Sequence, residues 1–426
     1  MHQRRTGFFM NYWAMLLHIY QPPFQSYEIL KKVDDESYSK LFDVFLRFPS
    51  SKLTLNINGI LTELLSNYKM SETIEKIKKL AENGQLRFTG SGKYHPLFPL
   101  IPLSEMRRQI HLNEEYNRQI LGPKYSDPKG FFPPELAISR SLLELLKEMQ
   151  YKWALATGVA CPAKWPIHWY YTYKGLPIFF RDTVISDQIS FKQIKPLDFV
   201  TKIQTLFSDD HYVITASDGE TYGHHIENYE EDFLATVLAK LESTEDVKMI
   251  FLDEIPDLFE SQGEVIPINS SWSTSANDLT AKNPYPLWAD LKNEIHTIQG
   301  VLQEKALRLF QILDRNASKI PEDQLEFYKN ARVNLDKGEQ SCRLWWASTY
   351  NYNEDLIIRG VQFLVTSTVN AYRALFSIPL KRKEQKDVQN LQKDFRTEYS
   401  DLLQALAKET ENRSRYKPSK YQVPIE

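Results

Sequence analysis

Short apolar segments alternate with amphipathic helical segments over the first 260 residues of this 426-residue chain. The length and the β-branched and aromatic content of the apolar segments predict strands, at 12–17, 53–57, 86–89, 130–132, 153–157, 177–180, 212–215 and 249–252. Apolar residues at three-and-four spacing predict helices between them, with faces at Ile74, Ile77, Leu80 and Ala81, and at Leu142, Leu143, Leu146 and Met149. Strands separated by helices pair in parallel through right-handed crossovers. The region is therefore an α/β domain, either a barrel or a doubly wound open sheet.

Polar and ionisable residues follow many of these strands, and they favour the barrel. They are His18, Asn56, Asn58, the segment 89–95, Glu135, Asp182, Asp218 and Asp253. A barrel gathers all of its strand ends at one mouth, whereas an open sheet leaves most of them far from its switch point. We therefore expect one active-site mouth lined by these side chains.

The pattern changes after residue 264. A segment rich in Ser, Thr and Asn at 270–283 predicts a loop. Long helical stripes follow it, at Leu291, Ile295, Ile298, Leu302, Leu309 and Leu313, at Val361, Leu364, Tyr372 and Leu375, and at Leu391, Phe395, Tyr399, Leu402 and Leu406. We therefore predict a catalytic β/α barrel over 1–265, and a linker loop with a C-terminal helical domain over 266–426.

Charge and cysteine content exclude several classes of partner. Lys and Arg total 52 against 55 Asp and Glu, so the chain lacks the positive excess that binds nucleic acid. Cys161 and Cys342 have no metal or redox spacing, which fits a reducing cytoplasm. No apolar stretch is long enough to span a membrane. The segment His2-Gln3-Arg4-Arg5 precedes an apolar run without a cleavage site, so we expect no signal peptide, and Met10 is a possible natural start.

Two segments have the composition of an active-site rim. The segment 212–225 runs from a strand into Asp218, Glu220, two glycines and paired histidines. Glycine permits unusual backbone angles and close approach of a ligand. In the second segment, two prolines stiffen the chain before Glu135, and Ser139 is a candidate N-cap for the helix that follows.

Together these segments resemble glycoside hydrolase family 57. The family's His-x-His-Gln-Pro motif is similar to His18-Ile19-Tyr20-Gln21-Pro22, with Tyr20 in place of the second His. Further motifs resemble Gly84-Gln85-Leu86-Arg87-Phe88-Thr89-Gly90 with Tyr94-His95-Pro96-Leu97, then Phe132-Pro133-Pro134-Glu135, Asp218-Gly219-Glu220-Thr221-Tyr222-Gly223-His224 and, more weakly, Cys342-Arg343-Leu344-Trp345-Trp346-Ala347-Ser348.

The resemblance implies an incomplete (β/α)7 TIM-like barrel followed by a C-terminal α-helical domain. It implies a retaining enzyme of the α-amylase or 4-α-glucanotransferase type that acts on α-glucans, with Glu135 as nucleophile and Asp218 as acid/base. Such chemistry needs two carboxyl groups about 5 to 5.5 Å apart. The substrate-binding candidates are His18, Tyr20, Gln21, His95, Arg181, Asp187, Glu220, His224, Trp272 and Trp345. We expect no cofactor and no metal, a cytoplasmic enzyme, and an α-glucan or oligosaccharide partner without nucleic acid or membrane; the oligomeric state stays open.

The same residues are compatible with other interpretations. His18 could be a core histidine, Arg181 and Asp187 a structural ion pair, and the tryptophans packing residues. A metal-dependent polysaccharide deacetylase or α-mannosidase-like enzyme would need His18, His95, Asp218 and one of His224 or His225 to converge, although no metal-ligand spacing supports this. A catalytically silent carbohydrate-binding protein is the third possibility. If Glu135 is not the nucleophile, Asp182, Glu220 and Asp253 are the remaining acids.

Overall fold

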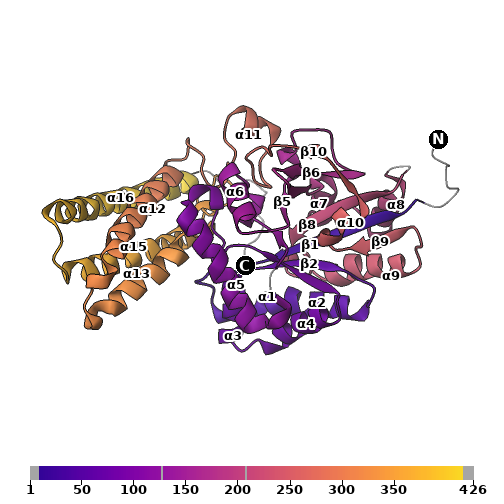
Figure 1. The fold of residues 1–426 in the computed structure, drawn as a ribbon, viewed down its shortest axis with the longest axis horizontal. Coiled ribbons are helices and arrows are strands. Elements are labelled where there is room, and N and C mark those ends of the chain that lie inside the picture. The colour runs from indigo at the N-terminus through magenta and orange to yellow at the C-terminus, as the bar shows by residue number, and fades with distance from the viewer. Residues whose placement is uncertain (1–8, 126–127, 207–208, 416–426) are drawn as a thin grey trace. The chain divides into compact units, whose positions relative to one another are not determined.

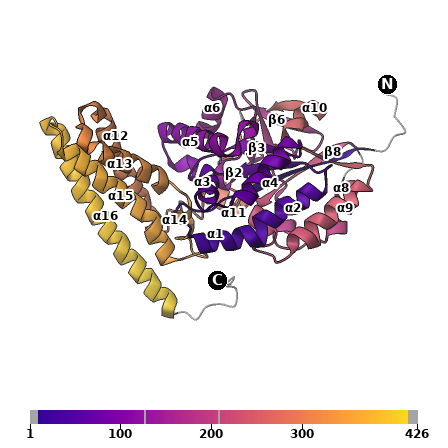
Figure 2. The ribbon, with the colours of Figure 1, turned by 90° about the horizontal axis from the view of Figure 1, so that it is seen from below.

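The computed structural model describes residues 9–125, 128–206 and 209–415, and the chain forms two compact units, Met1–Leu279 and Thr280–Glu426. The first unit is a mostly parallel sheet surrounded by helices, and the second is a set of long helices (Figures 1 and 2). The segment His2-Gln3-Arg4-Arg5 lies outside the described residues. None of the described helices is long and apolar enough to cross a membrane. Cys161 and Cys342 are both free.

Ten strands form the sheet of the first unit. They are β1 (Asn11–Ile19), β2 (Leu53–Ile57), β3 (Leu86–Gly90), β4 (Gly130–Phe131), β5 (Trp153–Ala156), β6 (Trp169–Tyr173), β7 (Leu176–Phe180), β8 (His211–Asp218), β9 (Val247–Ile250) and β10 (Glu260–Glu264). Seven of them are parallel neighbours in the order β7-β5-β4-β3-β2-β1-β8. Just past β7, the Asp182 N–H donates to Ile214 O of β8 at 2.8 Å. The predicted seven-stranded barrel is therefore confirmed.

Two strands were not predicted from the sequence. β6 pairs antiparallel with β7, and β10 pairs parallel with β6. Lys174 and Gly175 join β6 to β7 and both have positive φ, 47° and 82°, as a two-residue hairpin turn of type I′ requires. All five residues of β10 are exposed, so this strand lacks the apolar alternation by which strands are recognised.

Helices alternate with the strands along this part of the chain, and most of them bury apolar residues against the outer face of the sheet. They are α1 (Tyr27–Val33), α2 (Ser39–Arg47), α3 (Gly59–Asn67), α4 (Ser71–Glu82), α5 (Leu103–Leu121), α6 (Arg140–Glu148), α7 (Thr183–Ser190), α8 (Pro196–Thr205), α9 (Thr236–Glu242), α10 (Ile255–Leu258) and α11 (Ala276–Thr280). Alternate residues of β1 face the two sides of the sheet: Trp13 and Met15 pack against the helices, while Ala14 and Leu16 join the core inside the barrel. His18 continues the inward-facing series.

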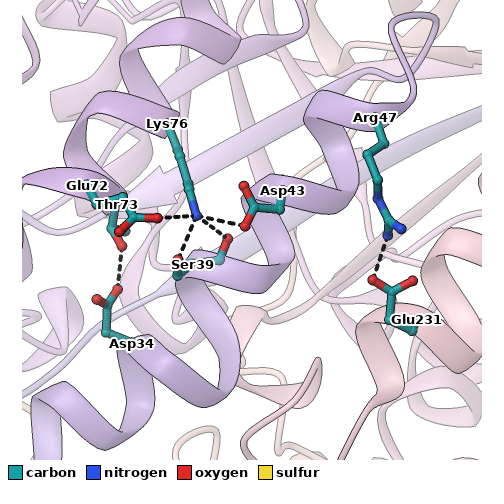
Figure 3. Close-up of polar contacts among 8 residues, drawn as sticks. All are labelled: Asp34, Ser39, Asp43, Arg47, Glu72, Thr73, Lys76 and Glu231. Atoms are coloured by element: carbon teal, nitrogen blue, oxygen red, sulfur yellow. Dashed lines mark hydrogen bonds and ion pairs between the residues drawn. The ribbon is translucent and has the colours of Figure 1, made fainter.

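A π-helical segment, Asp34–Tyr38, joins α1 to α2. Contacts with α4 fix its position (Figure 3). Thr73 Oγ1 donates to Asp34 Oδ1 at 2.6 Å. Lys76, also on α4, lies 2.7 Å from Asp43 of α2. π-helical turns carry one extra residue and are frequent at functional sites.

The chain after β9 closes the amino-terminal end of the barrel. β9 pairs with the first residues of β1, whereas β2 pairs with the last ones. Asp253 accepts a hydrogen bond from Trp153 Nε1 at 2.6 Å and lies 3.3 Å from Arg87. Trp153 and Arg87 stand at the beginnings of β5 and β3. The expectation that Asp253 joins the mouth is therefore wrong: it lies at the opposite end, because β9 is offset toward the start of β1.

The second unit contains α12 (Glu294–Arg315), α13 (Leu325–Gly338), α14 (Cys342–Trp345), α15 (Glu354–Phe376) and α16 (Arg382–Arg415). The predicted stripes mostly face its core. Leu291 is the exception, because it precedes α12 and is 91% exposed. The helix begins later than predicted, where the Asn293 side chain accepts a hydrogen bond from His296 N.

Candidate active site

A layer of polar side chains crosses neighbouring strands at the carboxyl end of the barrel. His18 on β1 is in register with Asp218 on β8 and with Asn56 on β2. His18 Nδ1 lies 2.6 Å from Asn56 Oδ1, and Asn56 Nδ2 donates to Thr89 Oγ1 of β3 at 2.9 Å. Residues in register on parallel strands point to the same face. The layer therefore lines the barrel mouth.

This hydrogen-bond chain assigns the form of His18. The Asn56 amide nitrogen is used by Thr89, so its oxygen faces His18 and accepts a hydrogen bond from Nδ1–H. Burial lowers the pKa of His18, although the nearby Asp218 charge opposes this. The neutral ring then carries its lone pair on Nε2, where it can accept a hydrogen bond from a hydroxyl.

Glu135 lies on a strained turn directly after β4. Its φ of 61° and ψ of 16° are left-handed, a conformation that costs a non-glycine residue roughly 1 to 2 kcal/mol. Surrounding hydrogen bonds hold the turn: Leu136 N donates to Pro133 O at 2.8 Å, and Trp272 N donates to Glu135 O at 2.9 Å. Strain of this kind persists only where the surroundings fix it, and it clusters at functional sites.

The Glu135 carboxylate lies beside a group of stacked rings. Its side chain is 14% exposed, and Oε1 is 3.7 Å from His95 Nδ1. The His95 ring stacks on Tyr20 at 4.1 Å and on His18 at 4.9 Å between centroids. Trp272 meets His18 edge to face at 6.2 Å. The stack leads from Glu135 through His95 to His18, whose neighbour in the strand register is Asp218.

His95 is neutral in this environment. Burial, assisted by the neighbouring His18, lowers its pKa well below the usual range for histidine. The pKa values of both stacked histidines, His18 and His95, are therefore lowered, which favours their neutral forms.

Asp218 ends β8 without a partner for its carboxylate. Within the described residues, no hydrogen bond and no ion pair reaches its side chain. Burial raises the pKa of Asp218, while His18 and Arg181 oppose the rise. A carboxyl with raised pKa at a barrel mouth has the properties of a general acid.

Glu220 lies on the 3-10 turn that follows Asp218, and unlike Asp218 its carboxyl group accepts several hydrogen bonds. Its side chain is buried, and its Oε1 accepts hydrogen bonds from Tyr38 OH, from Tyr20 N at 3.3 Å and from Gln21 Nε2 at 3.5 Å. Burial and the charge of Asp218 raise the pKa of Glu220 to about 8. Tyr38 belongs to the π-helical segment, which the sequence analysis did not predict as part of the site.

The glycines of this turn, Gly219 and Gly223, allow other segments of the chain to pack closely against it. A Cβ at Gly223, whose φ is +107°, would lie 1.9 Å from Glu36 O, and one at Gly219 would lie 2.4 Å from Ile19. The two glycines thus allow the π-helical segment and β1 to come close to the turn. The sequence analysis had instead assigned them to the close approach of a ligand. His224 is fixed by the same segment, because its Nδ1 lies 2.6 Å from Glu36 Oε2.

Arg181 completes the mouth on the β7 side. It is buried, its Nε donates to Ala216 O at 2.7 Å, and its guanidinium lies 2.6 Å from Asp187 and 6.0 Å from the Trp272 ring. Asp187 thus orients Arg181 from α7 while remaining partly exposed. Asp182 accepts a hydrogen bond from Ile185 N and caps α7, so its carboxylate is occupied.

The residues of the metal alternative do not form a cluster. Among the described residues, His18, His95, Asp218 and His224 or His225 do not bring one ligand atom each within 4.8 Å of one another. His18 Nδ1 is also occupied by Asn56. This geometry gives the deacetylase or mannosidase alternative no support.

Trp345 lies on α14 in the second unit, where its ring meets Trp346 edge to face at 4.5 Å. Its role at the substrate stays a prediction.

Comparison with known proteins agrees with the fold and the motifs. The sequence model of glycosyl hydrolase family 57 matches residues 3–268. An alpha-amylase of Pyrococcus abyssi is 24% identical over 281 residues, which are 62% of this chain and 42% of that protein. The chain thus spans less than half the length of the curated relatives it matches.

Solved structures extend the likeness to the fold of nearly the whole chain. A GH57 branching enzyme of Thermococcus kodakaraensis has a TM-score of 0.70 at 14% identity and covers 91% of this chain and 95% of its own. The 4-alpha-glucanotransferase of Thermococcus litoralis has a TM-score of 0.67 at 17% identity, with 85% and 60% covered. With its barrel, its ordered motifs and the family match over residues 3–268, the chain belongs to glycosyl hydrolase family 57.

Proposed function

We propose that this protein is a retaining glycoside hydrolase or transglycosylase that acts on α-glucans, with Glu135 as nucleophile and Asp218 as acid/base. The observation that carries the proposal is the unequal environment of two acids at one mouth. Glu135 lies on a rigid turn beside His95, whereas the unpartnered Asp218 has a raised pKa. Two carboxyl groups whose environments differ divide the roles of nucleophile and acid. The names of the relatives, alpha-amylase and 4-alpha-glucanotransferase, support α-glucan as the substrate.

In the first step, the Glu135 carboxylate attacks the anomeric carbon while protonated Asp218 gives its proton to the departing glycosidic oxygen. The C–O bond to the leaving sugar breaks, and a glycosyl ester with Glu135 forms. In the second step, ionised Asp218 takes a proton from water or from a sugar hydroxyl, whose oxygen displaces Glu135. Water gives hydrolysis and a sugar gives transfer, with the same anomeric configuration retained.

Substrate binding in this proposal uses hydroxyl contacts and stacking. His18 Nε2 accepts a hydrogen bond from a sugar hydroxyl, and Arg181 and Gln21 donate. The Tyr20 and Trp272 rings offer apolar faces to the sugar. Because the substrate is uncharged, we expect moderate salt to change its affinity little.

The test is product analysis with a maltooligosaccharide series, using wild-type protein and the Glu135→Gln variant purified in parallel. Shorter products alone indicate hydrolysis, and products longer than the substrate indicate transfer. Proton NMR of the first product reports the anomeric configuration. Inverted product, or equal turnover by the variant, contradicts the proposal.

A further inference from the structure

The turn after β8 carries two acids, and the mechanism above uses one of them. Asp218 and Glu220 are two residues apart and are held in opposite ways: no described residue donates to Asp218, whereas three donors from two other segments reach Glu220. We propose that the two carboxyls hold one proton between them at neutral pH, and that Glu220, held by Tyr38, is the one that carries it and keeps it available to Asp218. This inference rests on the proposed function for the use of the proton, although not for its location.

The Glu220 carboxyl has no cationic partner among the described residues. Glu220 is 6% exposed. In the described part of the chain, no Lys, Arg or His nitrogen lies within 4.0 Å of its carboxyl, and all three donors are neutral groups. A buried carboxylate without a cation is costly, and such a group keeps its proton instead.

The hydrogen-bond donors around Glu220 distinguish its two carboxyl oxygens. The hydrogen bonds from Tyr38 OH, Tyr20 N and Gln21 Nε2 all end on Oε1. A protonated carboxyl has one carbonyl oxygen that accepts and one hydroxyl oxygen that donates. The arrangement assigns Oε1 as the carbonyl and leaves Oε2 to carry the proton.

Asp218 and Glu220 have different charged neighbours. Asp218 faces His18 and Arg181, which favour its ionised form, whereas Glu220 faces the negative charge of Asp218. Tyr38 stays protonated, because burial and Glu220 raise its pKa well above 10, and Asp34 contributes in the same direction. The pair therefore loses its first proton at Asp218 and its last at Glu220, near pH 8.

The consequence is an alkaline limit on the reaction. With one proton on the pair, Asp218 can be protonated and act as the acid. Once the last proton is lost, no acid remains and the first step fails. Loss of the last proton of the Asp218–Glu220 pair then sets the alkaline limb of kcat/KM. Substitutions at or next to Glu220 should shift the pH of this limb.

Two variants move the limb in opposite directions. Glu220→Gln keeps a neutral acceptor and donor but removes the shared proton, so the alkaline limb of kcat/KM should move down by at least one pH unit, whatever the height of the profile. Tyr38→Phe removes a hydrogen bond that lowers the pKa of Glu220, so the limb should move up. Glu231→Gln, at an exposed ion pair with Arg47, is the control and should leave the profile unchanged.

The experiment has an arm that needs no substrate. Infrared difference spectra of the free protein between pH 6 and pH 10 should show a protonated carboxyl C=O band that disappears near pH 8 in the wild type and is missing in Glu220→Gln. Loss of this band in Asp218→Asn instead of Glu220→Gln would overturn the inference, as would an alkaline limb that Glu220→Gln leaves in place. A normal band in a protein inactive on glucans would refute the proposed function alone.

Discussion

The acids at the two ends of the barrel have opposite kinds of surroundings. At the amino-terminal end, Asp253 has both a hydrogen-bond donor in Trp153 and a cation in Arg87. At the mouth, Asp218 has no partner among the described residues, and Glu220 has only neutral ones. A carboxylate that is satisfied by its neighbours stabilises a fold, whereas one that is buried without a cation keeps its reactivity at a cost in stability. An acid at a strand end is therefore not by itself a sign of catalysis. In this protein, the partners of the carboxyl group distinguish an acid that stabilises the fold from a candidate catalytic acid.

The strongest test of this comparison is Glu135→Gln. Loss of the nucleophile should lower kcat/KM on maltooligosaccharides by roughly 10⁴-fold or more. The activity on an aryl glycoside should fall by a similar factor, because both substrates need the attack of Glu135 on the anomeric carbon. Circular dichroism of the purified variant checks that it is folded. Near wild-type rates on either substrate would return Glu220 to consideration as the nucleophile.

Asp218→Asn should have the next largest effect, and one that depends on the leaving group. We expect a loss of roughly 10³-fold on natural glucans, which depart only when protonated. An activated aryl glycoside needs no such help, so its first step should be largely spared, as a burst of the aryl product would show. Equal losses on the two substrates would remove Asp218 from the acid role.

At the other end of the barrel, Asp253→Ala should change stability and leave catalysis alone. The variant leaves the buried Trp153 N–H without an acceptor, which costs about 1 to 3 kcal/mol in the free energy of unfolding. Urea denaturation measures this, with Asp257→Ala on α10, an exposed position, as the matched control. A large fall in kcat for folded Asp253→Ala would break the comparison.

The smallest expected effect concerns pH and the stacked histidines. The folded-state pKa values of His18 and His95 lie below the unfolded value near 6.5. Between these values the unfolded chain binds more protons, so the free energy of unfolding falls as pH falls below about 6.5, by up to about 1.4 kcal/mol per pH unit for each histidine. His95→Asn, in which Asn tolerates the left-handed φ of 55°, should flatten this slope. His111→Asn, at a side chain 60% exposed, should not; equal slopes in the two variants would show that His95 does not contribute.

The sequence predicted the inner strands of the barrel well, because each is an apolar run bounded by polar residues. β2 was predicted with its observed ends, and β8 was predicted too short because Ala216, Ser217 and Asp218 extend it without large apolar side chains. β6 and β10 extend the sheet beyond the barrel, and both were missed. All five residues of β10 are exposed, and a pattern of apolar residues cannot detect such a strand. β6 does bury Tyr171 and Tyr173, so its aromatic content could have revealed it.

The residues of the candidate site were predicted from sequence motifs, but the contacts that hold them in position were not. The structure places His18, Tyr20, Gln21, His95, Arg181 and Glu220 at one mouth, with Trp272 beside them. No pattern indicated that Tyr38 would bind Glu220, because that contact joins residues 182 positions apart. Nor could composition reveal the left-handed backbone of Glu135, which tertiary hydrogen bonds impose.

The π-helical segment Asp34–Tyr38 also limits how the chain can change in length. Each residue of an α-helix turns about 100° around the axis, so deleting one residue here would restore an ordinary helix from α1 through α2. Every side chain before the deletion would then rotate by about that angle relative to those after it. Glu36 and Tyr38 would no longer keep their contacts with His224 and Glu220 while α2 stayed anchored on α4. Substitutions are therefore easier to accommodate in this segment than insertions or deletions.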